Sequence, residues 1–458
     1  MIKFSRRPYY KRSFPRSRRP RWLSWRWIAI AIPLGLLVLE ILLRLLFDFG
    51  DSQQFYGSDT PFINAHRLQF LTETGEPIAA FPDGGNLKIQ RNFAVGFQLA
   101  GNQESKFWKI NEQGFRDLKP VPLAKPPGEI RIFFLGGSAA FGQWSQSNTN
   151  TISSKLEALL NQRIAAQRQS PQTYQPDILP PYRSEQPKAL ARTPKIRDGQ
   201  YRVINAAVPG YSSGNELAQL ALQILPYRPD AIVVMDGYAD IMLPSRATAT
   251  EIPHLDRFLA DASAHYSAQL NLAWSNWLGQ LYLIQAPRRW FFPPQLSLAQ
   301  QVLPVTQPDS LAQALPADDA ELSRRITRYQ SHQIQLAQLC SGARIPLLLV
   351  VQPEITSRPS EALSLKEEEI RKQLGNTYQE NLPKAYARLA SAATQLQQGF
   401  PKTVTVLNFY EQTQKFPTPA FLDPIHLESE TNTAIAQSLY NTFLNLPAIK
   451  IIPRSPEN

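Results

Sequence analysis

A serine near the start of the main apolar region stands where an open α/β sheet could use it for chemistry. Residues 130–135 are rich in β-branched, aliphatic and aromatic types, which predicts a buried strand. Gly136 and Gly137 allow a sharp turn, so Ser138 would present its hydroxyl at the carboxyl end of that strand. Such a serine becomes a nucleophile when a base takes its proton. The alternative is a phosphate cradle, but no Lys-Ser/Thr pair follows the glycines, as a P-loop requires.

A base for this serine must come from one of five histidines: His66, His254, His265, His332 and His426. His426 lies after the last predicted strand and just before the last predicted helix, at the same edge of the sheet as Ser138. Asp423 precedes it by three residues, so one loop could aim both side chains at the serine. An isolated Asp-x-x-His can also be a loop with a surface salt bridge. Its position at the edge that carries Ser138 favours the catalytic interpretation.

The elements that would position these residues alternate regularly between strand and helix. Apolar β-type runs predict five strands at 130–135, 202–208, 231–235, 345–351 and 403–407. Stretches with apolar residues at helical spacing separate them. This alternation predicts a three-layer α/β fold with one five-stranded parallel sheet covered by helices on both faces.

In this order, the motifs resemble those of the SGNH (GDSL-like) hydrolase superfamily, over about residues 130–242 and 320–445. The nucleophile turn matches Gly136-Gly137-Ser138, an oxyanion glycine matches Gly210 after the second strand, and the Asp-x-x-His block matches Asp423 and His426. The resemblance implies a flavodoxin-like fold and an oxyanion hole formed by the N–H groups of Ser138 and Gly210. It also implies that no metal or organic cofactor is needed.

One block departs from the superfamily pattern. That block is Gly-x-Asn-Asp, whose Asn donates a side-chain N–H to the oxyanion, whereas this chain has Gly237, Ala239 and Asp240 at the matching positions. Alanine cannot donate, and the loss of one such donor typically costs on the order of 10² to 10³ in rate. Asn215 is a candidate for a substitute donor. Otherwise the protein has moved away from efficient hydrolysis.

An apolar run near the N-terminus predicts a membrane anchor. Residues 28–47 form this run, and its 20 residues are about the length that crosses a bilayer as a helix. Glu40 and Arg44 interrupt it, spaced to pair on one helix face. A cleaved signal peptide is the alternative, but the run is long for one and no small-residue cleavage site follows it. The turn at residues 114–116 also resembles membrane-anchored members of the superfamily.

The distribution of charge points to a membrane orientation rather than to nucleic acid. The formal net charge is +11, yet ten of the 48 basic residues lie in the first 26 positions, where no acidic residue occurs. The rest of the chain is close to neutral, which argues against a nucleic-acid-binding face. A basic segment before the apolar run places the N-terminus in the cytoplasm and the main domain outside it. We therefore expect a single-pass inner-membrane protein with an extracytoplasmic domain. Cys340 is the single cysteine, which excludes an internal disulfide.

These observations divide the chain into five regions and two insertions. They are a basic tail (1–27), a transmembrane helix (28–47), an irregular N-terminal extension (48–128), a hydrolase-like domain (129–446) and a loose tail (447–458). Within the domain, composition predicts a Pro-rich disordered insertion at 168–200 and an insertion or lid at 243–319.

The sequence supports two classes of function. The first is a membrane-anchored serine esterase that acts on carboxylic esters, including O-acyl groups of envelope glycans or lipids, or an acyltransferase that uses the same triad. The second is a weakly active or non-catalytic module of the same fold that binds an envelope glycan or a membrane partner. Ala239 is the residue that argues for the second class.

Overall fold

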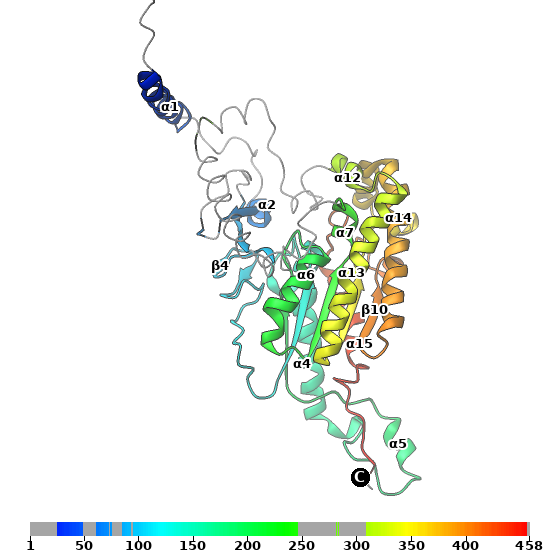
Figure 1. The fold of residues 1–458 in the computed structure, drawn as a ribbon. Coiled ribbons are helices and arrows are strands. Elements are labelled where there is room, and N and C mark those ends of the chain that lie inside the picture. Colours follow the sequence, from blue (N-terminus) through cyan, green and yellow to red (C-terminus); the bar gives the residue numbers. More distant parts are fainter. Residues whose placement is uncertain are drawn as a thin grey trace, which may run out of the picture. The chain divides into compact units, whose positions relative to one another are not determined.

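Figure 1 shows the fold in a computed structural model of the chain, which forms two compact units. The first unit comprises residues 1–55 and 277–293, and the second comprises 56–276 and 294–458. The structure describes residues 25–48, 61–72, 74–75, 85–92, 95–245, 281, 283 and 308–455. Every residue for which the sequence predicts a catalytic role lies in the second unit.

The second unit is organised around a five-stranded parallel sheet, as the sequence predicts. Its strand order is β10-β9-β8-β6-β7, and neighbouring strands all run in the same direction. This order places the first strand of the sheet beside the second and third, which is the flavodoxin-like arrangement. The strands are β6 (Glu129–Gly136), β7 (Gln200–Asn205), β8 (Ala231–Asp236), β9 (Leu347–Val351) and β10 (Val404–Asn408).

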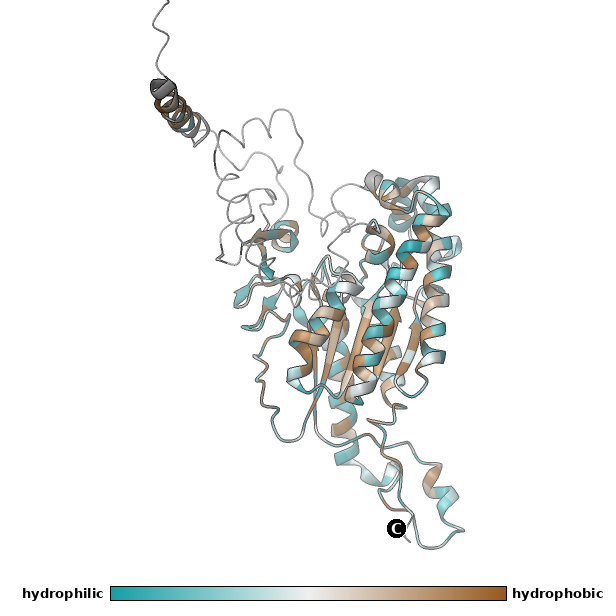
Figure 2. Ribbon diagram, viewed as in Figure 1, coloured by the Kyte–Doolittle hydropathy of each residue, from teal (hydrophilic) through white to brown (hydrophobic). Residues whose placement is uncertain are grey.

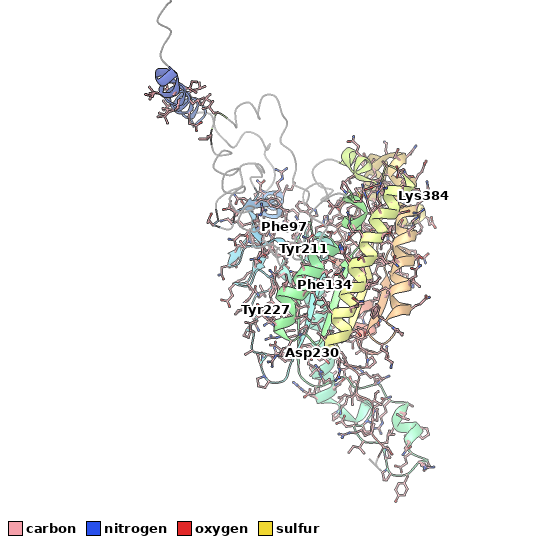
Figure 3. The ribbon with its side chains drawn as sticks, in the orientation of Figure 1. Phe97, Phe134, Tyr211, Tyr227, Asp230 and Lys384 are labelled. Atoms are coloured by element: carbon pink, nitrogen blue, oxygen red, sulfur yellow. The ribbon has the colours of Figure 1, made fainter. Side chains whose placement is uncertain are left out.

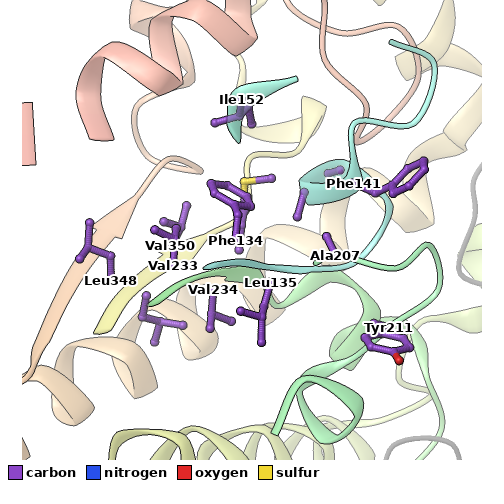
Figure 4. Packing of buried hydrophobic residues seen from close by; sticks show 14 of the residues in the cluster. Phe134, Leu135, Phe141, Ile152, Ala207, Tyr211, Val233, Val234, Leu348 and Val350 are labelled. Carbon is purple, nitrogen blue, oxygen red and sulfur yellow. The ribbon is translucent and has the colours of Figure 1, made fainter. Parts of the chain in front are cut away.

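Helices cover both faces of this sheet, and the strand side chains are buried accordingly. Strands β8 and β9 are buried at every position. Figure 4 shows Phe134 and Val233 on one face of the sheet and Leu135 and Val234 on the other. Side chains on both faces must therefore be apolar, which explains the continuous hydrophobic runs in these strands (Figure 2).

The covering helices form two layers (Figure 1). Helices α4 (Ile152–Gln169) and α15 (Ser429–Phe443) pack on each other on one face. Helices α6 (Ser213–Gln219), α13 (Asp319–Ala343) and α14 (Leu365–Gly399) cover the other. The shorter described helices of this unit are α2 (Pro61–His66), α3 (Ser138–Phe141), α5 (Gln186–Leu190), α7 (Tyr238–Met242) and α12 (Pro308–Ala314).

The long helices begin at side chains that satisfy their first N–H groups. Thr151 accepts from the Ser154 N–H at the start of α4, and Asp318 accepts from the Glu321 N–H at the start of α13. Ser364 and Glu367 form a reciprocal capping box at the start of α14. Local sequence therefore fixes where each helix starts.

The N-terminal extension is more regular than the sequence predicts. Strands β1 (Leu68–Leu71), β2 (Leu87–Asn92) and β3 (Gly96–Leu99) form a small mixed sheet, and β4 (Gln103–Glu104) pairs with β5 (Lys109–Ile110). The sequence of 48–128 predicts an irregular segment with short strand-like runs broken by Gly and Pro, and the structure adds the pairing between those runs.

The extension is joined to the main domain by an aromatic contact. The Phe97 and Tyr211 rings meet edge to face at 5.2 Å, and the Tyr211 hydroxyl donates to the Phe97 carbonyl at 2.6 Å (Figure 3). Tyr211 directly follows the predicted oxyanion glycine. The extension therefore packs against the loop that is expected to form the oxyanion hole.

The two segments expected to lack structure instead pair with each other. Three backbone hydrogen bonds join them: the Arg197 N–H donates to the Ile449 carbonyl, the Ile451 N–H to the Lys195 carbonyl, and the Leu179 N–H to the Arg454 carbonyl. The Gln167 side chain also makes two hydrogen bonds with the backbone of Ile196. Disorder at 168–200 and a loose tail at 447–455 are therefore incorrect predictions. Their partners are distant in sequence, so composition alone could not indicate this order.

The remaining predicted insertion lies largely outside the described residues. Of the segment 243–319, the structure describes 243–245, 281, 283 and 308–319, and the last stretch includes α12. Whether the segment forms a lid therefore stays a prediction. Cys340 is fully buried in α13, and burial raises the pKa of its thiol to about 12.

The predicted anchor forms helix α1 (Trp25–Asp48) in the first unit. Most of its described apolar side chains are exposed, for example Ile30 and Leu37. Glu40 is buried and accepts a hydrogen bond from the Leu283 N–H at 3.0 Å. Among the helices that the structure describes, none is both long enough and apolar enough to cross a bilayer.

Candidate active site

The side chains of Ser138, His426 and Asp423 form a continuous hydrogen-bonded chain. Ser138 Oγ lies 2.8 Å from His426 Nε2, and His426 Nδ1 lies 2.6 Å from Asp423 Oδ2. The serine and the aspartate are 285 positions apart in sequence. Ser138 retains 6% of its exposure, and His426 retains 1%. The three residues expected to act together are therefore in mutual contact at the carboxyl edge of the sheet.

Close backbone packing at the end of β6 fixes the position of Ser138. Gly136 has φ +145°, and a Cβ atom there would lie 2.3 Å from the Met235 carbonyl oxygen of β8. Only glycine fits such an approach. Gly137 caps the short helix α3, of which Ser138 is the first residue. The serine therefore starts a helix directly after the strand, which presents its hydroxyl at the sheet edge.

Hydrogen bonds within one tight loop fix Asp423 next to His426. Asp423 Oδ1 accepts from the N–H groups of Ile425 at 3.0 Å and His426 at 2.9 Å. Burial raises the pKa of Asp423, but the nearby charge of His426 and these hydrogen bonds lower it more, so the pKa is below its ordinary value. The aspartate is therefore an anion at neutral pH and can orient the imidazole.

Trp144 is a further residue at this site, which the sequence did not indicate. Its indole Nε1–H donates to Asp423 Oδ2 at 3.0 Å, so that one carboxylate oxygen receives both the indole and the imidazole N–H. Its ring meets the His426 ring edge to face at 6.3 Å. Trp144 has φ +64°, an unusual backbone conformation for a bulky residue. The hydrogen bond to Asp423 depends on this conformation, and no local sequence pattern predicts it.

The predicted oxyanion glycine lies in the loop after β7, beside the nucleophile turn. Gly210 has φ +89°, and Val208 N–H donates to the Gly136 carbonyl at 3.0 Å. A Cβ atom on Gly137 would lie 3.1 Å from the Tyr211 carbonyl, so the two turns touch. Ser138 is the first residue of α3, and the first N–H groups of a helix lack acceptors within the helix, so this is where an oxyanion donor is expected.

The position of the missing amide donor follows β8, where α7 begins. Gly237 has φ +109°, and Ala239 retains 9% exposure in the first turn of the helix. Asp240 accepts from the Ser213 N–H at 3.0 Å and from the Ser213 hydroxyl at 2.5 Å. Asp240 therefore holds the start of α6, three residues after Gly210, and does not contact the triad.

The proposed substitute donor Asn215 has another role. Its Oδ1 accepts from the N–H and hydroxyl of Ser212 in the capping box of α6, and its Nδ2 donates to the Val95 carbonyl at 2.9 Å. The amide is thereby committed to the helix start and to the N-terminal extension. The structure does not support Asn215 as the replacement for the missing asparagine.

Arg116, from the N-terminal extension, holds the short helix that Ser138 begins. Its guanidinium donates to the carbonyls of Phe141 at 3.1 Å and Gly142 at 2.8 Å, at the end of the helix that Ser138 begins. Asn205 donates to the Phe141 carbonyl as well, at 3.2 Å. Burial lowers the pKa of Arg116 to about 9, so the side chain remains a cation at neutral pH. The sequence singled out this turn without showing what it contacts.

Two other histidines, His66 and His332, lie in the described part of the chain and make different contacts. His332 Nδ1 lies 2.9 Å from the Ser213 hydroxyl in the α6–α13 contact. His66 packs between Phe62, Phe107 and Trp144, and burial lowers its pKa to about 4. His254 and His265 lie outside the described residues.

Comparisons with known proteins give only distant likenesses. No protein-family model matches the chain, and no curated protein matches it significantly. Solved structures that it resembles include a lipase/acylhydrolase from Enterococcus faecalis (11% identity, TM-score 0.33) and an acetylxylan esterase from Geobacillus stearothermophilus (10%, 0.33). The alignments cover 69% and 68% of this chain and 95% and 93% of the other chains.

Similarity at this level says nothing about activity. What this site can do follows from its own atoms: a serine hydroxyl bonded to an imidazole, and an imidazole bonded to an ionised carboxylate. Such an arrangement can activate an oxygen nucleophile.

Proposed function

We propose that this protein is an SGNH-type serine esterase that cleaves carboxylic esters. The observation that carries the proposal is the unbroken chain of short hydrogen bonds, 2.8 Å from Ser138 to His426 and 2.6 Å from His426 to Asp423. A surface salt bridge would need no serine, and a structural serine would need no buried imidazole–carboxylate pair. Only the catalytic interpretation uses all three groups.

In the first half of the reaction the serine is acylated. His426 Nε2 takes the Ser138 proton while Oγ forms a bond to the carbonyl carbon of the ester. Asp423 keeps the imidazole oriented and stabilises its positive charge. The carbonyl oxygen becomes an oxyanion held by the N–H groups of Ser138 and Gly210. The imidazolium then gives its proton to the alcohol oxygen as the C–O bond breaks, and the alcohol leaves.

In the second half, His426 takes a proton from water as the water oxygen bonds to the acyl carbon. The imidazolium then returns a proton to Ser138 Oγ as the acyl–serine bond breaks, and the acid leaves. A sugar hydroxyl in place of water would make the same site an O-acyltransferase. Because Ala239 provides no side-chain donor, we expect a turnover rate on the order of 10² to 10³ below that of an otherwise equal site with asparagine there.

We further propose that α1 holds the enzyme on a membrane with its catalytic domain outside the cytoplasm. The 20-residue apolar run, the basic segment before it and the exposed aliphatic side chains of α1 support this part of the proposal. The esters of such an enzyme would include O-acyl groups of envelope glycans or lipids.

The second candidate is a module of the same fold that binds an envelope component without turnover, and Ala239 is the observation that favours it. One experiment separates the two. The purified full-length chain should hydrolyse 4-nitrophenyl acetate, Ser138→Ala should abolish this turnover, and Ser147→Ala, a serine of the following loop, should retain it. Equal rates in the parent and in Ser138→Ala would refute the esterase.

A further inference from the structure

The loop that carries the two partners of the nucleophilic serine is a small hairpin, residues 420–428 (the histidine hairpin). Backbone hydrogen bonds join its two sides. The Leu422 N–H donates to the His426 carbonyl at 2.8 Å. The Glu428 N–H donates to the Ala420 carbonyl at 2.9 Å. These bonds fix the shape of the hairpin but not its position relative to the serine, which must come from contacts with other elements.

The buried carboxylate of Glu367 contacts the base of the histidine hairpin. This residue lies in the first turn of α14 and is fully buried. Its Oε1 accepts from the N–H groups of Ala420 at 2.8 Å and Phe421 at 3.1 Å. Its Oε2 accepts from the N–H and the hydroxyl of Ser364, at 2.8 Å and 2.7 Å. One carboxylate thus joins the start of a long helix to the hairpin.

Glu367 is charged, and the charge has a buried partner. Burial raises the pKa of the carboxyl, but the four hydrogen bonds that it accepts lower it more, so the pKa is below its ordinary value. Arg358 Nε lies 3.4 Å from Glu367 Oε1, and neither side chain is exposed. The guanidinium also donates to the carbonyls of Thr413 at 2.8 Å and Pro417 at 2.9 Å, in the segment that leads into the hairpin. Hydrogen bonds to an ionised acceptor are roughly twice as strong as those between neutral groups, so this pair holds the hairpin firmly.

A displacement at this contact would pass directly to the imidazole. Phe421 is bridged across the hairpin to Leu427, the residue next to His426. His426 Nε2 must stay within hydrogen-bond reach of Ser138 Oγ, and the two atoms are 2.8 Å apart. A misplacement of about 1 Å that originates far from the reacting atoms can cost roughly 100-fold in rate. A carboxylate that fixes the base of the hairpin can therefore control the rate without touching the substrate.

We propose that Glu367 is a positioning residue, which holds the histidine hairpin where its imidazole reaches Ser138. The inference rests on the esterase proposed above and adds to it a residue outside the triad. A carboxylate that only capped α14 would use one oxygen for Ser364 and none for the hairpin. Because Glu367 is fully buried and cannot touch a substrate, its loss should lower kcat and leave KM unchanged.

The test compares one chemical change at two neighbouring positions of the full-length chain. Glu367→Asp keeps the charge beside Arg358 but shortens the side chain by one methylene group, whereas Glu368→Asp makes the same change at an exposed site. On 4-nitrophenyl acetate, kcat should fall at least tenfold in Glu367→Asp, with KM within twofold of the parent. Both constants should stay within twofold in Glu368→Asp. Equal kcat in the two variants, or a rise in KM alone, would overturn the assignment.

A second variant covers the case in which Glu367→Asp does not fold. Glu367→Gln keeps the length of the side chain but offers one oxygen to the four N–H and O–H groups that donate to the carboxylate. We expect the same separation of the two constants, with kcat at least threefold below the parent and KM unchanged. A folded Glu367→Gln with the kcat of the parent would contradict the positioning role.

Hydrogen–deuterium exchange separates failure of this inference from failure of the esterase, because it needs no turnover. In Glu367→Asp the peptides of the histidine hairpin should take up deuterium faster, while those of β6 and β8 should match the parent. All of these peptides should match the parent in Glu368→Asp. Faster uptake confined to the hairpin supports the contact even if the parent proves inactive, in which case the esterase alone fails. Unchanged uptake at the hairpin, or faster uptake throughout the sheet, would overturn the inference and leave an active esterase intact.

Discussion

Replacement of Trp144 by phenylalanine tests whether the indole positions the triad. The substitution keeps an aromatic ring against His66 and Phe62 but removes the N–H that donates to Asp423 Oδ2 at 3.0 Å. Asp423 would still accept from two backbone N–H groups and from His426. The carboxylate would therefore remain in place while it loses one of four N–H donors.

The size of the effect follows from the charge of the acceptor. A hydrogen bond to a charged group contributes about 1.5 to 3 kcal/mol net. The other three donors compensate in part, so we expect the transition state to lose stabilisation at the low end of that range. This loss corresponds to about a tenfold decrease in kcat. KM should change little, since the N–H does not touch the substrate. The proton between His426 and Asp423 should also shift its NMR resonance, because its acceptor oxygen would lose a competing donor.

Trp108 offers a matched control within the same chain. Its buried indole N–H donates to the Ala65 carbonyl at 2.9 Å, so Trp108→Phe removes an indole hydrogen bond of similar length away from the triad. The assay is steady-state hydrolysis of 4-nitrophenyl acetate together with thermal unfolding of both variants. If Trp144→Phe lost no more kcat than Trp108→Phe, or raised KM alone, the positioning role of Trp144 would be wrong.

Three further predictions follow from the site and its supports. Ala239→Asn restores a side-chain donor and should raise kcat by up to about 10²-fold, measured on the same ester; a rate at or below the parent's would show that the amide cannot reach the oxyanion. Asp240→Ala leaves the buried Ser213 N–H without its acceptor, while the Ser213 hydroxyl keeps His332 as a partner, so urea unfolding should show a loss of about 1 to 3 kcal/mol. Burial lowers the pKa of His66 to about 4, compared with 6.5 in the unfolded chain. The neutral, buried imidazole therefore contributes its full stability above pH 6.5, and this contribution is lost as the pH falls toward 4 and through it. His66→Phe should therefore flatten the decline in unfolding free energy between pH 6.5 and 4, and an unchanged decline would refute this cause.

The sheet could be predicted because its strands are buried on both faces. Residues 231–235 form a continuous apolar run, and 130–135 are apolar except for Arg131. The structure extends the strand at 231–235 by one residue and the strand at 130–135 by one residue at each end. The end of β7 was predicted three residues too late. At Asn205 the chain leaves the sheet because its carbonyl accepts from the Arg116 N–H and its amide bonds the end of α3. These partners lie far away in sequence, so a local pattern cannot reveal them.

Within the site, too, the parts that could not be predicted are those that depend on contacts between residues distant in sequence. Ser138, Asp423 and His426 could be found because their types and spacing carry the chemistry. Trp144 could not, because its role depends on a left-handed backbone conformation and on a partner 279 positions away. Arg116 lies in the turn at 114–116 that resembles the superfamily's membrane-anchored members. Only the fold shows that its guanidinium donates to the carbonyls at the end of α3.

The most direct test of the central claim is covalent labelling of the full-length chain with a fluorophosphonate, followed by mass spectrometry of the peptides. An activated serine attacks the phosphorus and stays phosphonylated, whereas an unactivated hydroxyl does not react. We expect one modified residue, Ser138, and no labelling in His426→Ala, which lacks the base. Labelling that spares Ser138, or that persists there at an equal rate without His426, would contradict the triad.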